Sequence, residues 1–255
     1  MKSGKRRSIL YGLIGIVILL TLWEISLRIY LAATGEFQFA DFLPGRGVTA
    51  LVNLLTQARF WSSVGASFSR IFLGLLISTV LGIAGGILIG TNRILLEISS
   101  PPIQFLRMVS PISWMPIALI FLPGFEEAII FIVAVATVWP ILLNSANGIA
   151  GVDPKLVEMA QNQGARRWNL LTRLILPAAL PQIMSGLRFA IGIAWVVLVP
   201  AELLGISSGL GYLINDARNT LEYDILIAVI LAIGILGFGL DQLFHQIQRR
   251  LDWYQ

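Results

Sequence analysis

The longest polar stretch of the chain is Asp153–Pro177, DPKLVEMAQNQGARRWNLLTRLILP, and the sequence around it is largely apolar. Asp153 is a favourable N-cap and Pro154 suits the first turn of a helix, so a helix is predicted to begin here. Gly164 can adopt the left-handed conformation that ends such a helix. A second short helix should follow, with its apolar residues on one face and Pro177 as its stop. The stretch is therefore predicted to form a helical hairpin.

The composition of the whole chain is typical of an integral membrane protein. Of its 255 residues 56% are hydrophobic and only 13% are charged, and the mean hydropathy is +0.82. The sequence contains no cysteine, which excludes a disulfide framework and a thiolate metal site within it. Its net charge of +4 does not by itself indicate nucleic-acid binding, because basic residues also set membrane topology.

Six segments are apolar over the roughly twenty residues that a helix needs to cross a bilayer. The first is interpreted as a retained span, because its apolar run continues past the place where a signal peptide would be cleaved. The third contains Pro111, Pro116 and Pro123, so a broken or kinked helix is expected there. The six predicted spans are Ile9–Tyr30, Ser67–Thr91, Ile103–Leu122, Ala128–Asn147, Gln182–Leu204 and Tyr223–Phe244.

The chain is expected to form one all-helical transmembrane domain in two parts. Residues 1–66 hold the first span and an amphipathic connector, Thr49–Phe60, on the outer surface. Residues 67–255 hold the other five spans. Most Lys and Arg residues would lie on one side of the membrane, which the positive-inside rule makes the cytoplasm. This orientation places both termini and the Asp153–Pro177 hairpin in the cytoplasm, and leaves outside only Arg46, Arg59 and Arg218.

Small residues recur at every fourth position along the second predicted span. They place one small side chain on the same face for several turns, which allows another helix to approach closely. That helix could belong to the same bundle or to a second copy of the chain, and the sequence leaves both possibilities open. The residues are Gly74, Ser78, Gly82, Gly86 and Gly90.

Motifs for catalysis are missing from the sequence. It has no G-x-x-x-x-G-K-[ST] phosphate-binding loop, so any ATPase that drives it would have to be another chain or domain. The single histidine, His245, has no second histidine or cysteine to share a metal, and is interpreted as a membrane-surface residue. There is no G-x-S-x-G elbow and no paired-carboxylate constellation in the loops, so an enzyme is disfavoured.

Four ionisable residues fall within or beside the predicted spans. Arg188 lies deep in the fifth span, where it could form an ion pair or face an anion path, and both alternatives stay open. Glu202 is a further path candidate, although supporting the structure near an outer gate suits it better. Arg107 is predicted near the inner start of the third span and Arg70 near the outer start of the second. Both are expected to reach lipid headgroups with their long side chains.

The proline-rich third span supplies the remaining path candidates. Prolines free backbone groups, and irregular backbone at membrane depth persists only when it is buried in protein or lines a cavity. Ser110, Ser113 and Trp114 lie in this region. They could line a path, or the kink could simply shape the bundle.

The polar hairpin resembles the EAA loop of ABC-importer permeases. Glu158, Ala160 and Gly164, followed by nine residues and then Leu174–Pro177, have the spacing of that loop. Met159 replaces the middle alanine, and a leucine replaces the usual isoleucine. The segments SFSRIFLGLLISTVLGIAGGILIG, SPISWMPIALIF and GLGYLINDARN also resemble those of the nitrate/sulfonate/taurine branch of these permeases.

The resemblance implies a type I ABC-importer permease fold in a bacterial inner membrane. Two permease copies, expected to be identical, would form the path. Two cytoplasmic ATPase subunits would bind ATP and Mg, and a periplasmic or lipid-anchored protein would deliver the substrate. This chain would bind membrane lipid but no cofactor, metal or nucleic acid. The helix Asp153–Gln163 would be the coupling helix. The residues implied to contact the ATPase are Glu158, Met159, Ala160, Gly164, Ala165 and Arg166.

The substrate implied by that branch is a small anion. Nitrate is favoured, and bicarbonate, cyanate, sulfonates and taurine remain open. The alternative from another class is a self-contained, ion-coupled secondary transporter. It would show inverted repeats and acidic or polar coupling sites in mid-membrane, and the sequence shows no repeat and no carboxylate in the middle of a span.

Overall fold

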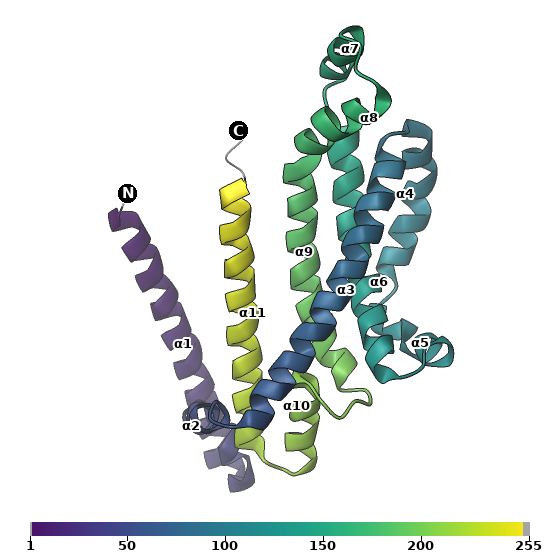
Figure 1. Ribbon diagram of the computed structural model, residues 1–255. Helices are drawn as coiled ribbons and strands as arrows, with labels where there is room; N and C mark the ends of the chain where they lie inside the picture. Colours follow the sequence, from purple (N-terminus) through teal and green to yellow (C-terminus); the bar gives the residue numbers. More distant parts are fainter. Residues whose placement is uncertain (1, 252–255) are drawn as a thin grey trace. The chain divides into compact units, whose positions relative to one another are not determined.

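The computed structural model describes residues 2–251. All the regular secondary structure in that range is helical (Figure 1). The elements are α1 (Lys2–Thr34), η1 (Phe37–Phe42), α2 (Pro44–Leu54), α3 (Ala58–Gly90), α4 (Arg93–Met108), η2 (Pro111–Trp114), α5 (Met115–Phe121), α6 (Phe125–Ala150), α7 (Pro154–Asn162), α8 (Arg167–Leu170), the π-helical turn η3 (Leu171–Ile175), α9 (Leu176–Glu202), α10 (Leu210–Asn219) and α11 (Tyr223–Leu251).

Five helices of the described range are long and apolar enough to cross a membrane. They are α1, α3, α6, α11 and the continuous helix Arg167–Glu202. A sixth crossing is possible where α4 is followed, after a bend of 89°, by η2 and α5. The prediction of about six spans with a broken third one is therefore confirmed.

The third span begins ten residues earlier than predicted, at Arg93. Asn92 caps it: its side-chain oxygen accepts hydrogen bonds from the amides of Ile94 (2.9 Å) and Leu95 (3.4 Å). Arg107 consequently lies in the last turn of α4, so its expected position near the start of the span is wrong. The helix ends at Met108, and Val109 after it is extended. Ser110, the residue before Pro111, has φ −57° and ψ 126°, which is outside the helical region as expected before a proline.

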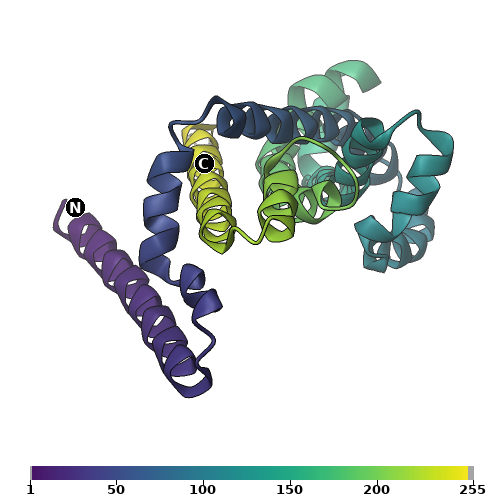
Figure 2. The ribbon, with the colours of Figure 1, turned by 90° about the horizontal axis from the view of Figure 1, so that it is seen from below.

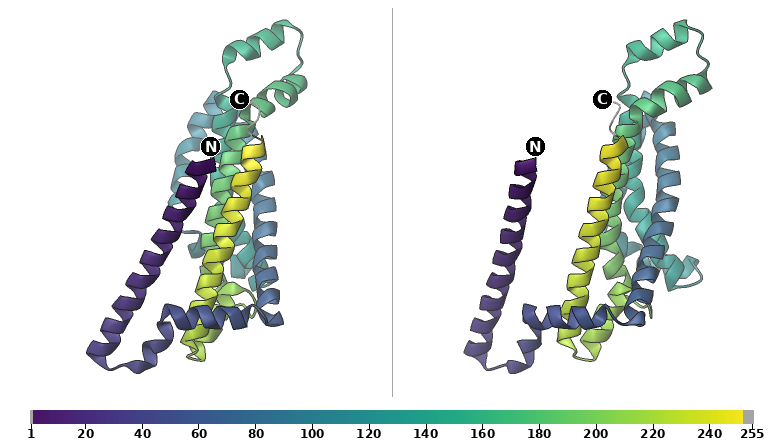
Figure 3. Two further views of the ribbon diagram at one scale, coloured as in Figure 1. Left: turned by 90° about the vertical axis from the view of Figure 1, so that its left-hand side faces the viewer. Right: turned by 60° about the vertical axis from the view of Figure 1, so that its left-hand side comes forward.

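The chain folds into two compact units, and the first comprises residues up to Ser63 together with Leu213–Ile235. In this unit α2 runs crosswise to α1 (Figures 2 and 3). The rings of Phe42 and Tyr223 stack with centroids 4.7 Å apart. The predicted connector Thr49–Phe60 is wrong in its bounds, because α2 already begins at Pro44, a residue suited to the first turn of a helix.

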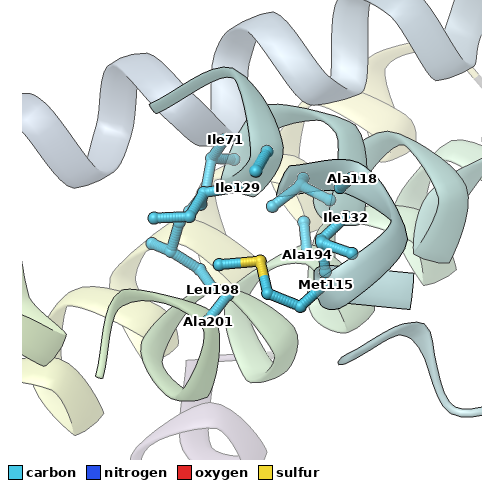
Figure 4. Close-up of a cluster of buried hydrophobic side chains, with 10 residues drawn as sticks. Ile71, Met115, Ala118, Ile129, Ile132, Ala194, Leu198 and Ala201 are labelled. Carbon is cyan, nitrogen blue, oxygen red and sulfur yellow. The ribbon is translucent and has the colours of Figure 1, made fainter. Parts of the chain in front are cut away.

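The second unit comprises Val64–Tyr212 and the chain from Leu236 onward. Its centre is the pair α6 and α9. One buried apolar cluster joins this pair to α3 and to the bent α5, which fixes the break after α4 against the bundle (Figure 4). The labelled residues of the cluster are Ile71, Met115, Ala118, Ile129, Ile132, Ala194, Leu198 and Ala201.

The stripe of small residues on α3 lies against α6 of the same chain. A Cβ atom placed on Gly74 would come within 2.6 Å of Val133, and one on Gly82 within 2.8 Å of Ile141. Between them, Ser78 accepts a hydrogen bond of 2.8 Å from the Thr137 hydroxyl. Gly86 and Gly90 meet α6 equally closely. The close approach of α3 and α6 therefore depends on glycine, which has no side chain, at these positions of α3.

We expect Gly82→Ala to destabilise the protein by about 1–3 kcal/mol, because the added methyl group overpacks this contact. Gly65→Ala is the matched control on the same helix, since nothing lies within 4 Å of a Cβ atom there. The control should be neutral or slightly stabilising, because alanine is the better helix former. Thermal unfolding of both variants in mild detergent measures the difference, and equal midpoints would contradict the packing argument.

Candidate functional site

The predicted hairpin projects beyond the spans of its unit as α7 and α8 (Figures 1 and 3). The Asp153 carboxylate caps α7 by accepting a 2.9 Å hydrogen bond from the Lys155 amide, as predicted. Gly164 ends the helix with φ +84°. The amide of Ala165 bonds the carbonyl of Ala160 (3.0 Å) and that of Gly164 bonds Gln161 (2.9 Å). These two bonds form a Schellman motif, which satisfies the last carbonyls of the helix.

The residues proposed to contact an ATPase lie on this exposed hairpin. Glu158, Met159, Gly164 and Arg166 are exposed, whereas Ala160 and Ala165 are partly buried. The small side chains therefore lie at the turn, and the charged and thioether groups face outward. The arrangement leaves one short helix and its turn free to contact a partner.

The predicted stop at Pro177 is wrong. Pro177 instead lies in the first turn of α9, and the helix runs without interruption from Arg167 to Glu202. The turn before it is π-helical: the amide of Leu176 bonds the carbonyl of Leu171, five residues back. This wider turn accommodates the proline ring, so the helix continues.

A buried ionic cluster joins α3, α6, α9 and the loop before α10. The side chain of Arg70 is 1% exposed, so the expectation that it reaches lipid headgroups is wrong. Its guanidinium bonds both oxygens of Glu126 (3.0 and 2.8 Å), one oxygen of Glu202, and the carbonyl of Ser208 (3.1 Å). Two carboxylates from other helices thus satisfy a cation that would otherwise need water or headgroups.

Glu202 is the most buried member of this cluster. It accepts hydrogen bonds from the hydroxyl of Ser67 (2.8 Å) and the amide of Gly211 (2.8 Å), in addition to its contact with Arg70. Ser67 in turn accepts from the amide of Leu210 (2.9 Å). These bonds tie the start of α10 to α3 and α9. The sequence showed each charge but not their meeting, which requires α3 and α9 to lie side by side.

A first cavity in the second unit has a volume of about 670 Å³ and lies along α9. Arg188 lines it, together with Ser185 and Asp241. The Arg188 guanidinium lies 3.6 Å from the Asp241 carboxylate and 3.0 Å from Nδ1 of His245. Arg188 is therefore ion-paired and also faces a cavity, while His245, expected to be a lone surface residue, contacts it.

The second cavity has a volume of about 490 Å³ and lies between the break after α4, α6 and α9. Val109 and Pro111 contribute to it from the break. The path candidates Ser110 and Ser113 are exposed beside it, whereas Trp114 packs against the apolar cluster. Among residues 2–251, no group of three or more His, Cys, Asp or Glu residues could hold a metal ion.

The crossings and the projecting hairpin together define a polytopic membrane protein. The chain belongs to the family of binding-protein-dependent transport system inner membrane components, whose model matches residues 78–253. It is therefore the permease subunit of an ATP-driven ABC transporter, in which another subunit hydrolyses ATP and a binding protein is a partner. It is a multi-pass protein of the inner membrane.

Curated relatives include three permeases with named substrates. The bicarbonate transport system permease protein CmpB of Synechococcus elongatus is 39% identical, over 76% of this chain and 70% of that protein. The nitrate import permease protein NrtB of Leptolyngbya laminosa is 34% identical, with the same coverage. The taurine transport system permease protein TauC of Escherichia coli is 32% identical, over 94% of this chain and 88% of that protein.

Solved ABC transporters share the fold. A chain of the MetNI methionine transporter in an inward-facing conformation matches with a TM-score of 0.65 and 17% identity, over 77% of this chain and 99% of that one. A chain of a bacterial alginate transporter matches with a TM-score of 0.65 and 18% identity, over 98% and 97%. The expected ABC-importer permease fold is thereby confirmed.

Proposed function

We propose that this permease imports a small anion, with nitrate and bicarbonate as the leading candidates. The observation that carries the proposal is that arginines line two cavities of the second unit, Arg188 in one and Arg107 in the other. The relatives named for nitrate, bicarbonate and taurine all act on molecules with an anionic group. The expectation favoured nitrate, and the higher identity with a bicarbonate permease makes bicarbonate an equal candidate.

The hairpin is proposed to couple the permease to its ATPase. In this proposal α7 is the coupling helix, and Glu158, Met159, Ala160, Gly164, Ala165 and Arg166 contact a cytoplasmic ATPase subunit. The Schellman motif supports the proposal, because it holds the turn rigid and lets α7 transmit ATPase closure as one body. The orientation with both termini in the cytoplasm belongs to the same proposal.

The complete importer is proposed to contain two copies of this chain, two ATPase subunits and one binding protein. Arg188, Ser110, Ser113 and Trp114 remain candidates for the translocation path. Glu202 is proposed to act by holding the outer end of α9, because its side chain is buried and fully bonded. Residues 1–66 are proposed to form a separate N-terminal part.

The experiment that tests this proposal is ATP-dependent uptake into proteoliposomes containing the permease, its ATPase and its binding protein. Nitrate, bicarbonate and taurine are compared in parallel with matched sodium concentrations. We expect uptake of one inorganic anion in preference to taurine. Uptake of taurine alone would indicate that the substrate is a sulfonate and not an inorganic anion. Uptake of none of the three would contradict the proposed substrate class.

A further inference from the structure

Among the residues that the structure describes, the second cavity is lined by hydrogen-bond donors and by no carboxylate. Its polar lining consists of Arg107, Trp139 and Asn144, from α4 and α6. The rest of the lining is apolar and includes Phe189 and Ile193 of α9. A guanidinium, an indole N–H and an amide N–H all favour an acceptor, and an anion satisfies all three at once.

Most of this donor capacity is unused within the part of the chain that the structure describes. Among the residues whose side chains the structure describes, neither Arg107 nor the indole N–H of Trp139 has a hydrogen-bonding or ion-pair partner. Asn144 donates one N–H to the carbonyl of Pro140 (2.8 Å), which leaves its second N–H available. Arg188 in the neighbouring cavity differs, because Asp241 and His245 already contact it.

The position of Arg107 along its helix makes an unpaired charge there costly. In the proposed orientation, Arg93 lies at the cytoplasmic surface of the membrane. Arg107 is about 21 Å further along α4 at a rise of 1.5 Å per residue, which is within a hydrocarbon layer about 30 Å thick, and it is exposed in the single chain. Ionisable residues at such depth face protein or a water-filled cavity, and they mark ion pathways. Arg107 faces the cavity beside the α4 break.

We propose that this cavity is a transmembrane binding site for the small anion, with Arg107 as its cation and Trp139 and Asn144 as orienting donors. This inference rests on the proposed anion import, to which it adds a location. Water occupies about 30 Å³ per molecule, so a cavity of about 490 Å³ can hold an oxyanion with part of its hydration shell. The anion therefore needs only partial desolvation to enter.

The absence of cysteine from the chain allows a direct measurement of the charge in the cavity. Val135→Cys introduces one thiol, at a partly buried position that lines this cavity and not the other. In the assembled permease–ATPase complex, the thiol is modified with methanethiosulfonates carrying either a sulfonate or a trimethylammonium group. We expect the anionic reagent to react faster, and Arg107→Gln to reduce the anionic-to-cationic rate ratio about tenfold.

Arg93→Gln is the matched control on the same helix. Its side chain is 90% exposed and pairs with Glu97, so the rate ratio should stay unchanged. Nitrate or bicarbonate at constant ionic strength should slow modification in the Val135→Cys variant and lose this effect when Arg107→Gln is added. A ratio unaffected by Arg107→Gln, or no protection by any of nitrate, bicarbonate and taurine, would overturn the site.

The modification rates do not depend on transport, so the two proposals can fail separately. If an anion slows thiol modification but is not taken up with ATP, the binding site is supported and the proposed cargo is contradicted. If an anion is taken up but does not slow thiol modification, the importer is supported and the binding site is contradicted. An unchanged KM for uptake in Arg107→Gln would lead to the same conclusion.

Discussion

Replacing Glu202 with glutamine is expected to destabilise the folded protein by about 3–5 kcal/mol. The substitution keeps the shape of the side chain but removes the buried charge that neutralises Arg70. Arg70 is 1% exposed and cannot turn to water or headgroups, so it would keep only the Glu126 carboxylate. The hydrogen bonds that hold the start of α10 would also weaken, because the Ser67 hydroxyl and the Gly211 amide both donate to Glu202.

Glu126→Gln is the matched control, because Glu126 bonds the same guanidinium but its side chain is 48% exposed. A partly exposed ion pair is screened by solvent, so a loss of about 1 kcal/mol or less is expected. Thermal unfolding of the purified complex in mild detergent provides the comparison. Equal destabilisation by the two substitutions would show that the burial of the Arg70–Glu202 pair does not account for its contribution to stability.

Gly164→Val is expected to reduce ATP-dependent uptake at least tenfold while leaving the transmembrane helices folded. The glycine has φ +84°, and a β-branched residue is a steric outlier at positive φ. Nothing lies within 4 Å of a Cβ atom at this position, so the effect would come from the backbone and not from a clash. The valine variant would straighten or unwind the turn and displace α7 from its ATPase.

Gly164→Asn is the control for this prediction, because asparagine tolerates the left-handed conformation better than other residues with a side chain. We expect it to retain most of the uptake and to co-purify with the ATPase. Both variants are compared by ATPase co-purification and by uptake at saturating ATP. Wild-type co-purification and uptake in Gly164→Val would show that the geometry of this turn does not carry the coupling.

The helical hairpin and the spans could be predicted because their signals are local. Asp153 as N-cap and Gly164 as the left-handed stop act within a few residues of the helix ends they determine. Hydropathy likewise locates a span from its own residues. The prediction that Pro177 ends the helix is wrong because a π-helical turn just before it accommodates the proline ring. Nothing in the sequence distinguishes that turn from an α-helical one.

The charged residues could not be placed from the sequence, because their environment is set by helices far away in the chain. Arg70 was expected at headgroups, yet Glu126 and Glu202 surround it. The prediction for Arg107 is wrong because Asn92 caps the helix and starts it ten residues earlier than hydropathy indicates. That cap is visible in the sequence as an asparagine before an apolar run. The meeting of Arg188 with His245 depended on α9 packing beside α11.

The central claim is that this chain is a permease driven by a separate ATPase, and uptake into proteoliposomes with one component omitted at a time tests it most directly. We expect uptake of an anion only when the permease, the ATPase, the binding protein and ATP are all present, and none when any of them is left out. Uptake by the permease alone without ATP would contradict the account, and would indicate an ion-coupled secondary transporter instead.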